Sequence, residues 1–504
     1  MSPASPPTDA WRMKKSLVAL PFIVLLTGCS FLATETVSTI GEVSFDTPLA
    51  IPPIADSRVD ATGTRVFELT TAASETWFGA GSATATWGFN GSYLGPTLVA
   101  DRGERVRVAV TNALDEPTTV HWHGMHLPAK MDGGPHQLIA PGEIWSPTWT
   151  LDQQAATLWY HPHLHGETTE HVMRGLAGLF LVRDDAEAAL DLPREYGVDD
   201  VPLIVSDVRF ADDGSFDTEA RRFVGPTGNE LLVNGTLGPY LEVTTTVTRL
   251  RLLNASSARV YDFRFDDARD VALIASDGGL LESPVTTDHV QLSPGERAEV
   301  LVTMAAGETA VLRSTPPDLG GPAVTAGQSA GNDSFDVLEL RASNRLKENA
   351  SVPSRLAELE RPDENAVTSE RRFVLDGTQI NNHEMEMDRV DEIVRLGATE
   401  VWDVTNNMAL PHSFHVHDVQ FQVLSIGGEA PPAELTGRKD TIYLRPNTAY
   451  RLIMRFDDYA DAQWPYMFHC HLLWHEDQGM MGQFLVVAPG DEPALPEGDH
   501  EHGG

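Results

Sequence analysis

The stretch GERVRVAVTN, residues 103–112, alternates apolar and polar side chains and ends in an asparagine. An alternation of period two is typical of a β-strand with one buried face. Two further stretches follow the same plan, TVTRLRLLN at 246–254 and GATEVWDVTN at 397–406. One strand pattern repeated at these separations predicts three related domains, each built around one copy.

Ring-bearing side chains follow each copy of the repeat. Nine and eleven residues beyond its asparagine, the three copies carry, in order, His121 and His123, Phe263 and Phe265, and His415 and His417. We therefore expect the middle domain to carry aromatic rings where its neighbours carry imidazoles, and to hold no metal ligands. Short Val-, Thr-, Leu- and Phe-rich runs separated by Gly, Pro, Asn and Asp fill the remaining sequence. The predicted fold class is all-β, an assembly of β-sandwich domains.

The repeats and the composition between them divide the chain into segments. We expect an export signal with a lipobox at 1–29, a Ser-, Thr- and Pro-rich tether at 30–60, domain one at 61–183, domain two at 200–342, an acidic linker at 343–370, domain three at 371–488 and a disordered tail at 489–504.

The charge balance narrows the choice of partners. Asp and Glu number 73 against 36 Lys and Arg, which gives a net charge of −37. So acidic a chain argues against nucleic acid and against anionic membrane surfaces as partners. Only two cysteines occur, Cys29 and Cys470, so the sequence holds no disulfide framework.

Cys29 ends the run Leu26-Thr27-Gly28-Cys29 after a short apolar stretch. That stretch is too short to span a bilayer and has the layout of an export signal. The four residues resemble the bacterial lipobox, in which the cysteine carries lipid. This predicts an exported lipoprotein held on the outer side of the cytoplasmic membrane. The alternatives are an ordinary cleaved signal or an uncleaved anchor.

Near its C-terminus the chain reads His469-Cys470-His471, followed by His475 and Met480. Neighbouring side chains on a strand point to opposite faces, so the two histidines share one face and Cys470 takes the other. A cysteine with two histidines and a distant axial methionine is the ligand set of an electron-transfer copper site. A few covalent bonds would then join the Cys470 thiolate to imidazoles on the opposite face, which provides a path for electrons.

Four His-x-His pairs extend this pattern: His121 with His123, His161 with His163, His415 with His417, and His469 with His471. Eight imidazoles are too many for one first-row ion, and about three ions with open positions would suit them. His412 lies three residues before His415, so on a strand it faces away from that pair and joins Cys470. Zinc would not require the thiolate and thioether of this second group.

These segments resemble the four copper-binding motifs of the multicopper oxidases, a family that includes laccases, bilirubin oxidases and bacterial cuprous oxidases. The resemblance spans about residues 60–487 and implies three cupredoxin-like Greek-key β-sandwich domains and four copper ions. It assigns His412, Cys470, His475 and Met480 to one type 1 copper, His121 and His415 to one type 2 copper, and His123, His161, His163, His417, His469 and His471 to a type 3 pair.

The same resemblance implies an enzyme that takes electrons singly from a small reductant and reduces dioxygen to water. Asp132 and Glu476 match carboxylates that the family uses to deliver protons. Phenols or aromatic amines are the expected reductants, because the Met-rich insert of cuprous oxidases is absent. Oxidation of Cu(I), Mn(II) or Fe(II) is the next alternative. Copper storage, or a scaffold role without turnover, is an alternative of another class.

Overall fold

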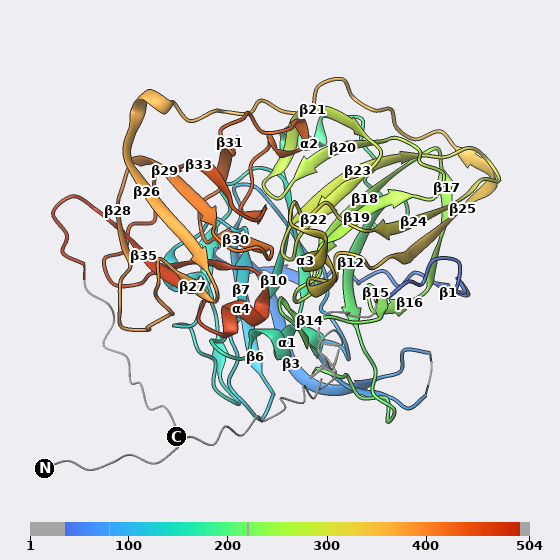
Figure 1. The fold of residues 1–504 in the computed structure, drawn as a ribbon, viewed down its shortest axis with the longest axis horizontal. Coiled ribbons are helices and arrows are strands. Elements are labelled where there is room, and N and C mark those ends of the chain that lie inside the picture. The colour runs from blue at the N-terminus through green and yellow to red at the C-terminus, as the bar shows by residue number, and fades with distance from the viewer. Residues whose placement is uncertain (1–35, 80, 219–220, 494–504) are drawn as a thin grey trace, which may run out of the picture. The chain divides into compact units, whose positions relative to one another are not determined.

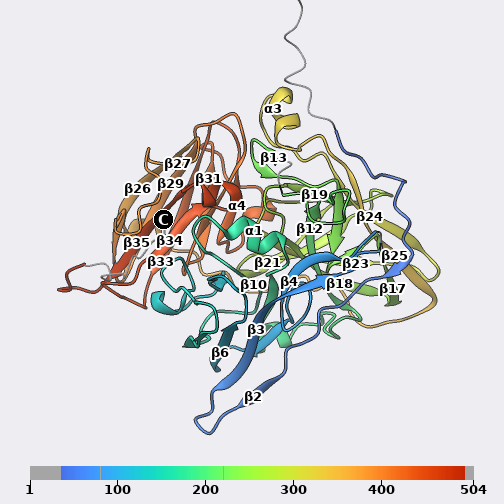
Figure 2. The same ribbon diagram turned by 90° about the horizontal axis from the view of Figure 1, so that it is seen from below.

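Strands are the main regular element of the structure, a computed structural model that describes residues 36–79, 81–218 and 221–493 (Figures 1 and 2). The helices in this part are short: α1 (Thr168–Met173), α2 (Asp185–Ala188), α3 (Ala323–Gln328) and α4 (Leu473–Asp477), with 3-10 turns at Ala129–Met131, Glu364–Ala366 and Ala433–Leu435. None of these helices is long and apolar enough to cross a bilayer. The predicted all-β class is confirmed. The predicted signal at 1–29, with Cys29, lies outside the described residues, as does most of the tail at 489–504.

Domain one is a sandwich of two sheets. One sheet contains β2 (Ser57–Val59), β3 (Arg65–Thr76), β4 (Thr84–Phe89), β6 (Arg105–Asn112), β8 (Ile144–Trp145) and β9 (Thr148–Thr150), and the other has the order β5 (Leu98–Asp101), β11 (Gly178–Arg183), β10 (Ala156–His161), β7 (His121–His123). Apolar side chains of both sheets form one core, in which Phe67 and Phe180 meet edge to face.

Domain two is the largest sandwich. Its first sheet has the order β16 (Thr236–Leu237), β15 (Glu230–Val233), β12 (Asp200–Val208), β18 (Val247–Asn254), β23 (Arg297–Thr303), β20 (Val271–Ser276), β21 (Gly279–Thr287), its second has the order β1 (Thr47–Pro48), β17 (Pro239–Thr245), β25 (Phe335–Lys347), β24 (Thr309–Thr315), β19 (Tyr261–Phe265), β22 (Val290–Leu292), and a hairpin joins β13 (Arg221–Arg222) to β14 (Gly225–Pro226).

Domain three pairs two five-stranded sheets. Their orders are β27 (Gln379–Ile380), β26 (Val367–Asp376), β29 (Ala398–Asn406), β33 (Thr448–Phe456), β31 (Phe421–Ile426), and β28 (Glu392–Arg395), β35 (Met481–Val487), β34 (Tyr466–Cys470), β30 (His412–Val416), β32 (Thr441–Leu444). Helix α4 follows β34 and lies beside α1 of domain one (Figures 1 and 2).

The three repeat copies form β6, β18 and β29, and each pairs in parallel with the first long strand of its domain. Their final asparagines, Asn112, Asn254 and Asn406, are fully buried. Each side-chain amide donates to two backbone carbonyls, and each side-chain oxygen accepts the N–H two residues later. The asparagine thus satisfies backbone groups where a buried strand ends, which explains its place in every copy.

The middle domain carries one extra residue after this asparagine. The asparagine amide bonds the carbonyls of Ile139, Leu292 and Leu444, which are the pairing partners of Thr118, Tyr261 and His412. These partners come six residues after the asparagine in domains one and three but seven after it in domain two. His415 is therefore matched in domain two by Arg264, and His417 by Asp266.

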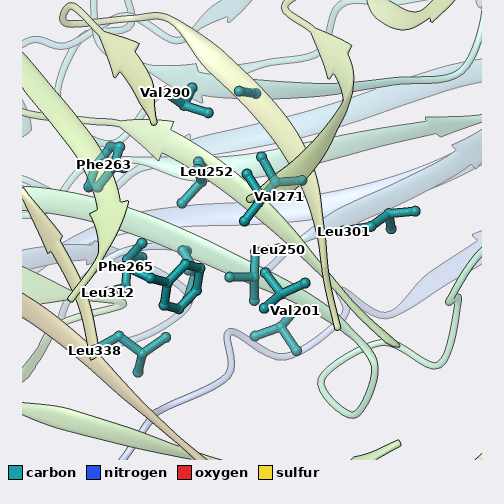
Figure 3. Packing of buried hydrophobic residues seen from close by; sticks show 14 of the residues in the cluster. Val201, Leu250, Leu252, Phe263, Phe265, Val271, Val290, Leu301, Leu312 and Leu338 are labelled. Atoms are coloured by element: carbon teal, nitrogen blue, oxygen red, sulfur yellow. The ribbon is translucent and has the colours of Figure 1, made fainter. Parts of the chain in front are cut away.

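The expectation that Phe263 and Phe265 replace imidazoles is consequently wrong. A shift of one residue turns every side chain of a strand to the other face. Both phenylalanines lie in the core of domain two, among residues such as Leu252 and Leu312 (Figure 3). The middle domain is still related to its neighbours, but its rings belong to the packed interior.

The segments expected to be a tether and a linker contact the domains. Within 30–60, the part that the structure describes contains β1, which pairs with β17, and β2, which pairs with β3. Backbone pairing at a sheet edge needs no particular side chains, so a Ser-, Thr- and Pro-rich composition does not reveal it. Within 343–370, Leu356 and Leu359 are buried, and the Leu356 N–H donates to the Glu282 carbonyl of domain two.

Candidate metal centre

Strand β34 presents His469 and Cys470 to opposite sides. Cys470 is fully buried in the core of domain three with Phe468. The ring of His469 lies on the side of domain one, 4.7 Å from the ring of His163. His471, directly after the strand, shares the side of His469, and its ring centre lies 4.9 Å from that of His123. One strand therefore contributes to two separate groups of side chains.

The first group brings together His412 at the start of β30, Cys470, and His475 in α4. His412 Nδ1 lies 3.4 Å from Cys470 Sγ and 3.2 Å from His475 Nδ1. Cys470 Sγ lies 3.7 Å from His475 Nδ1. The three donor atoms thus converge within a closed space in domain three. Met480 is also fully buried, and its N–H and carbonyl are bonded to His475 and Cys470 respectively.

Protonation in this first group favours a bound cation. Burial lowers the pKa of His412 well below its ordinary value and that of His475 to about 4, so both imidazoles are neutral. Burial also raises the pKa of the Cys470 thiol to about 12. A thiolate in this setting requires a metal ion, which displaces the proton when it binds. One thiolate and two imidazoles, with the buried Met480 in the same core cluster as Cys470, match the donor preferences of copper.

The second group contains eight histidine side chains, none more than 1% exposed. Strands β7 and β10 of domain one and β30 and β34 of domain three, with the residues just after them, contribute His121, His123, His161, His163, His415, His417, His469 and His471. Register places His121 opposite His161 and His415 opposite His469. Two antiparallel strand pairs, one from each domain, therefore meet through their imidazoles.

The inward nitrogens of this group form two trios and a pair. The Nε2 atoms of His163 and His417 each lie 3.2 Å from His469 Nε2; His123 Nδ1 lies 3.4 Å from His161 Nε2 and 3.2 Å from His471 Nε2; and the Nε2 atoms of His121 and His415 are 3.5 Å apart. Each trio and the pair draw on both domain one and domain three. No single domain can assemble any of them.

The outward nitrogens of six of these rings make hydrogen bonds to protein oxygens. His161 Nδ1 lies 2.8 Å from Pro162 O, His415 Nδ1 2.9 Å from Asp440 O, His123 Nε2 3.0 Å from Asp440 Oδ1, His121 Nδ1 3.1 Å from Asp132 O, His417 Nδ1 2.6 Å from Asp132 Oδ2 and His469 Nδ1 3.1 Å from Cys470 O. An imidazole that donates its outward N–H has a bare lone pair on the inward nitrogen. Converging lone pairs repel unless a cation lies between them, so this arrangement fits metal ions.

The two predicted carboxylates lie against the second group. Asp132 Oδ1 is 3.3 Å from His121 Nδ1, in addition to its contact with His417. Glu476 Oε1 is 3.3 Å from His163 Nδ1, and Glu476 Oε2 is 3.2 Å from His469 Nδ1. Burial alone would raise the pKa of Glu476, but the surrounding imidazoles outweigh it and hold that pKa below the usual range.

Comparisons with known proteins agree with this site. Family profiles described as multicopper oxidase match residues 71–187, 200–311 and 352–490. The sequence is 33% identical over 445 residues to the multicopper oxidase mco of Staphylococcus haemolyticus, covering 87% of this chain and 92% of that protein. The chain belongs to the multicopper oxidase family. Membership implies a copper-dependent oxidoreductase with dioxygen as its electron acceptor.

Two further relatives of this chain bear different names. The chain is 34% identical over 457 residues to the cell division protein FtsP of Photorhabdus laumondii, covering 88% of this chain and 92% of that protein. It is also similar to the solved structure of CueO, a laccase-like multicopper oxidase of Ochrobactrum sp.. That match has a TM-score of 0.79 and 37% identity, and covers 87% of this chain and all of the other. The cupredoxin-like architecture is thereby confirmed.

Three residues that hold the second group in place, directly or through a neighbour, were not predicted from the sequence. Asp440 and the hydroxyl of Thr441 each lie 3.0 Å from His123 Nε2. Arg297 of domain two donates to both carboxylate oxygens of Asp440 at 2.7 Å. None of them is close in sequence to a His-x-His pair. Asp440 and Thr441 come beside the histidines because β32, which starts at Thr441, pairs with the histidine-bearing β30, and this pairing is visible only in the fold.

Proposed function

We propose that this multicopper oxidase is laccase-like: it removes single electrons from phenols or aromatic amines and reduces dioxygen to two waters with four electrons. The observation that carries this proposal is that both groups of donors are complete and converge. A scaffold protein with this fold would need neither group. A single-site electron carrier would need only the first.

The donor geometry suggests how four copper ions would be held. His412, Cys470 and His475 would hold a type 1 copper, with Met480 as the further ligand that the resemblance gives; His121 and His415 would hold a type 2 copper, and the trios His123, His161, His471 and His163, His417, His469 one type 3 copper each. Copper bound in this way would accept electrons singly and supply dioxygen with four. The grouping into two trios refines the set of six that the resemblance gives.

The backbone around Cys470 would connect the two groups. Cys470 is bonded through its peptide groups to His469 on one side and His471 on the other. These two histidines belong to different trios. A short covalent path therefore leads from the thiolate to each trio, with no hydrogen bond or space to cross.

A thin layer of protein separates His475 from solvent. Its outward Nε2 donates to the Phe223 carbonyl at 3.2 Å, and the Phe223 side chain is 62% exposed. An exposed aromatic ring on the residue whose carbonyl meets His475 suits stacking with the ring of a phenol or aromatic amine. This supports an aromatic reductant that gives up its electron near Phe223.

We propose that Asp132 and Glu476 deliver the four protons that dioxygen reduction needs. Each accepts or faces the outward nitrogens of two imidazoles, so each fixes which ring nitrogen keeps its proton. Both are buried against the cluster, where water is excluded. Carboxylates so placed can hold a proton beside the reacting centre and pass it on.

One observation favours metal-ion oxidation as a second candidate. Met385, Met467 and Met481 form a buried cluster, with Met387 packed against it. Met481 pairs with His469 across the sheet, so the cluster is close to the second group. Thioethers are soft ligands that prefer Cu(I), which keeps oxidation of Cu(I) as the alternative, with Mn(II) and Fe(II) behind it.

Steady-state oxygen uptake by the copper-loaded protein tests these proposals. A phenol, Cu(I), Mn(II) and Fe(II) are compared as reductants, and the laccase-like function predicts the fastest uptake with the phenol. Phe223→Ser should raise KM for the phenol and leave metal-ion oxidation unchanged. Faster uptake with a metal ion would transfer the assignment to the second candidate. No uptake with any reductant would favour copper storage or a scaffold role, a role that the similarity to a cell division protein keeps open.

We also propose that the protein acts outside the cytoplasm. The export-like segment and lipobox at 1–29 indicate a protein held on the outer side of the cytoplasmic membrane by lipid on Cys29. Labelling with a radioactive fatty acid should mark the wild-type protein and not a Cys29→Ala variant. Equal labelling of both would refute the anchor.

A further inference from the structure

Arg297 joins all three domains at one point. It begins β23 of domain two and is buried. Its Nε donates to Thr157 O of domain one at 3.0 Å, and its Nη atoms donate to Gly295 O and Asp277 O of domain two at 3.1 and 3.0 Å. The same Nη atoms hold both oxygens of Asp440 in domain three at 2.7 Å. The guanidinium is thus bonded on every side.

Asp440 carries this connection to the imidazoles. Its Oδ1 lies 3.0 Å from His123 Nε2, and its peptide carbonyl lies 2.9 Å from His415 Nδ1. Among the eight histidines, His123 is the one that turns Nδ1 rather than Nε2 toward its partners. A carboxylate at Nε2 keeps the proton there and leaves the Nδ1 lone pair facing the trio.

Gly124 leaves the room that this ion pair needs. It follows His123 directly, with φ of +82°. A Cβ at this position would lie 2.6 Å from Arg297 Nη2 and 2.6 Å from Asp440 Oδ2. The absence of a side chain at Gly124 therefore allows the ion pair to lie against the strand that bears His123.

We propose that Arg297 is a positioning residue for the eight-histidine group, supplied by the domain that has no ligands of its own. Its paired donors fix the plane of the Asp440 carboxylate, and that carboxylate fixes the tautomer and orientation of His123. A lysine cannot do the same, because it offers a point charge in place of a planar fork. The inference rests on the proposed function in one respect, that these histidines bind copper.

Arg251 provides a matched control. It is buried in the same sheet of domain two, holds both oxygens of Asp200 at 2.6 and 2.8 Å, and donates to the Thr157 hydroxyl of domain one at 2.8 Å. It makes no contact with the eight histidines in the structure described. Arg251→Met therefore removes a comparable buried ion pair and a comparable interdomain bond, without touching Asp440.

The test compares copper content and spectra of copper-loaded Arg297→Met, Arg297→Lys and Arg251→Met. Arg297→Met should keep the visible absorption of the thiolate-bound copper but lose copper from the eight-histidine group, with affinity lowered about 10- to 100-fold. Arg297→Lys should retain the copper yet show an altered electron paramagnetic resonance signal. Arg251→Met should match the wild type in both measurements.

Energetic coupling between Arg297 and Asp440 gives a second readout. Asp440→Asn should reproduce the loss seen in Arg297→Met, and the double variant should add little to either, because both act through His123. Wild-type copper content and spectra in Arg297→Met would overturn the inference. If Arg297→Met does not fold, the altered spectrum of Arg297→Lys decides, and an unaltered one overturns it. A wild-type protein that binds no copper at the eight histidines would instead remove the proposed function.

Discussion

Strands β19 of domain two and β30 of domain three occupy the same place in their sandwiches but serve different ends. Toward the core they agree, because Phe263 and Phe265 match Phe414 and Val416, and all four are buried in their own domain. On the other face they differ, with Arg264 and Asp266 in domain two and His415 and His417 in domain three.

The difference separates what the sandwich needs from what the chemistry needs. The core-facing half of the strand pattern maintains the fold in both domains. The opposite half is free to vary, and it carries imidazoles only where another domain supplies partners for them. Fold and metal site are thus encoded in alternate residues of the same short strands.

The largest effect is expected from Cys470→Ser, which tests whether the first group of donors and the eight-histidine group work together. Serine cannot supply the thiolate, so the first copper and its visible absorption should be lost. Reductant-driven oxygen uptake should fall by well over the roughly 100-fold that is typical when a residue that only positions a ligand is lost. Copper in the eight-histidine group should be retained. A Cys470→Ser protein with wild-type uptake would show that the first group is dispensable.

Phe265→Ala tests the core-facing half of the comparison. Removing a buried phenylalanine should lower the free energy of unfolding by about 3–5 kcal/mol, measured by chemical denaturation of copper-free protein. Arg264→Ala, on the opposite face of β19, leaves the core packing intact and should cost less than Phe265→Ala, although it removes the guanidinium that pairs with Asp262. Equal losses from the two variants would mean that the faces of this strand are wrongly assigned.

Asp132→Asn tests the other face of the strands, where carboxylates hold the imidazoles in place. Asparagine keeps the shape but loses the charge that faces His121 and His417, so oxygen uptake should fall about 10- to 100-fold with little change in the visible absorption. Glu476→Gln should give a similar loss. Normal turnover in Asp132→Asn would remove this residue from the proton-delivery role.

The smallest effect concerns the ion pairs through which domain two meets domain one. Burial tends to raise the pKa of Glu299, but Arg249 and Arg251 lower it to about 2. Its contribution to stability is therefore complete above about 4.3, the pKa of an unfolded glutamate, and is lost as the pH falls toward 2. Glu299→Gln should have a lower free energy of unfolding than the wild type at pH 7, and that free energy should fall less than the wild type's as the pH is lowered from about 4.3 toward 2. Equal falls in the two proteins, measured by chemical denaturation at several pH values, would contradict this.

Sequence patterns are enough to predict the fold class and the side chains that converge. Alternation and the repeated Asn predict the sandwiches, and His-x-His spacing alone puts pairs of imidazoles on one face. The register of β19 is not predictable by counting, because one extra residue before Tyr261 leaves no mark in composition. The division into trios, and the part of Arg297, depend on contacts between domains far apart in sequence.

The interleaving of domain one and domain three in every trio has a consequence for how the protein is made. The four histidines of domain one emerge before domains two and three are made, whereas His469 and His471 come from β34 of domain three and the residue after it. A ribosome that has completed two domains has produced one histidine of the His163 trio, two of the His123 trio and one of the pair. Metal uptake at these sites can therefore finish only after domain three has been translated, so a chain released before that point is marked by its failure to retain copper.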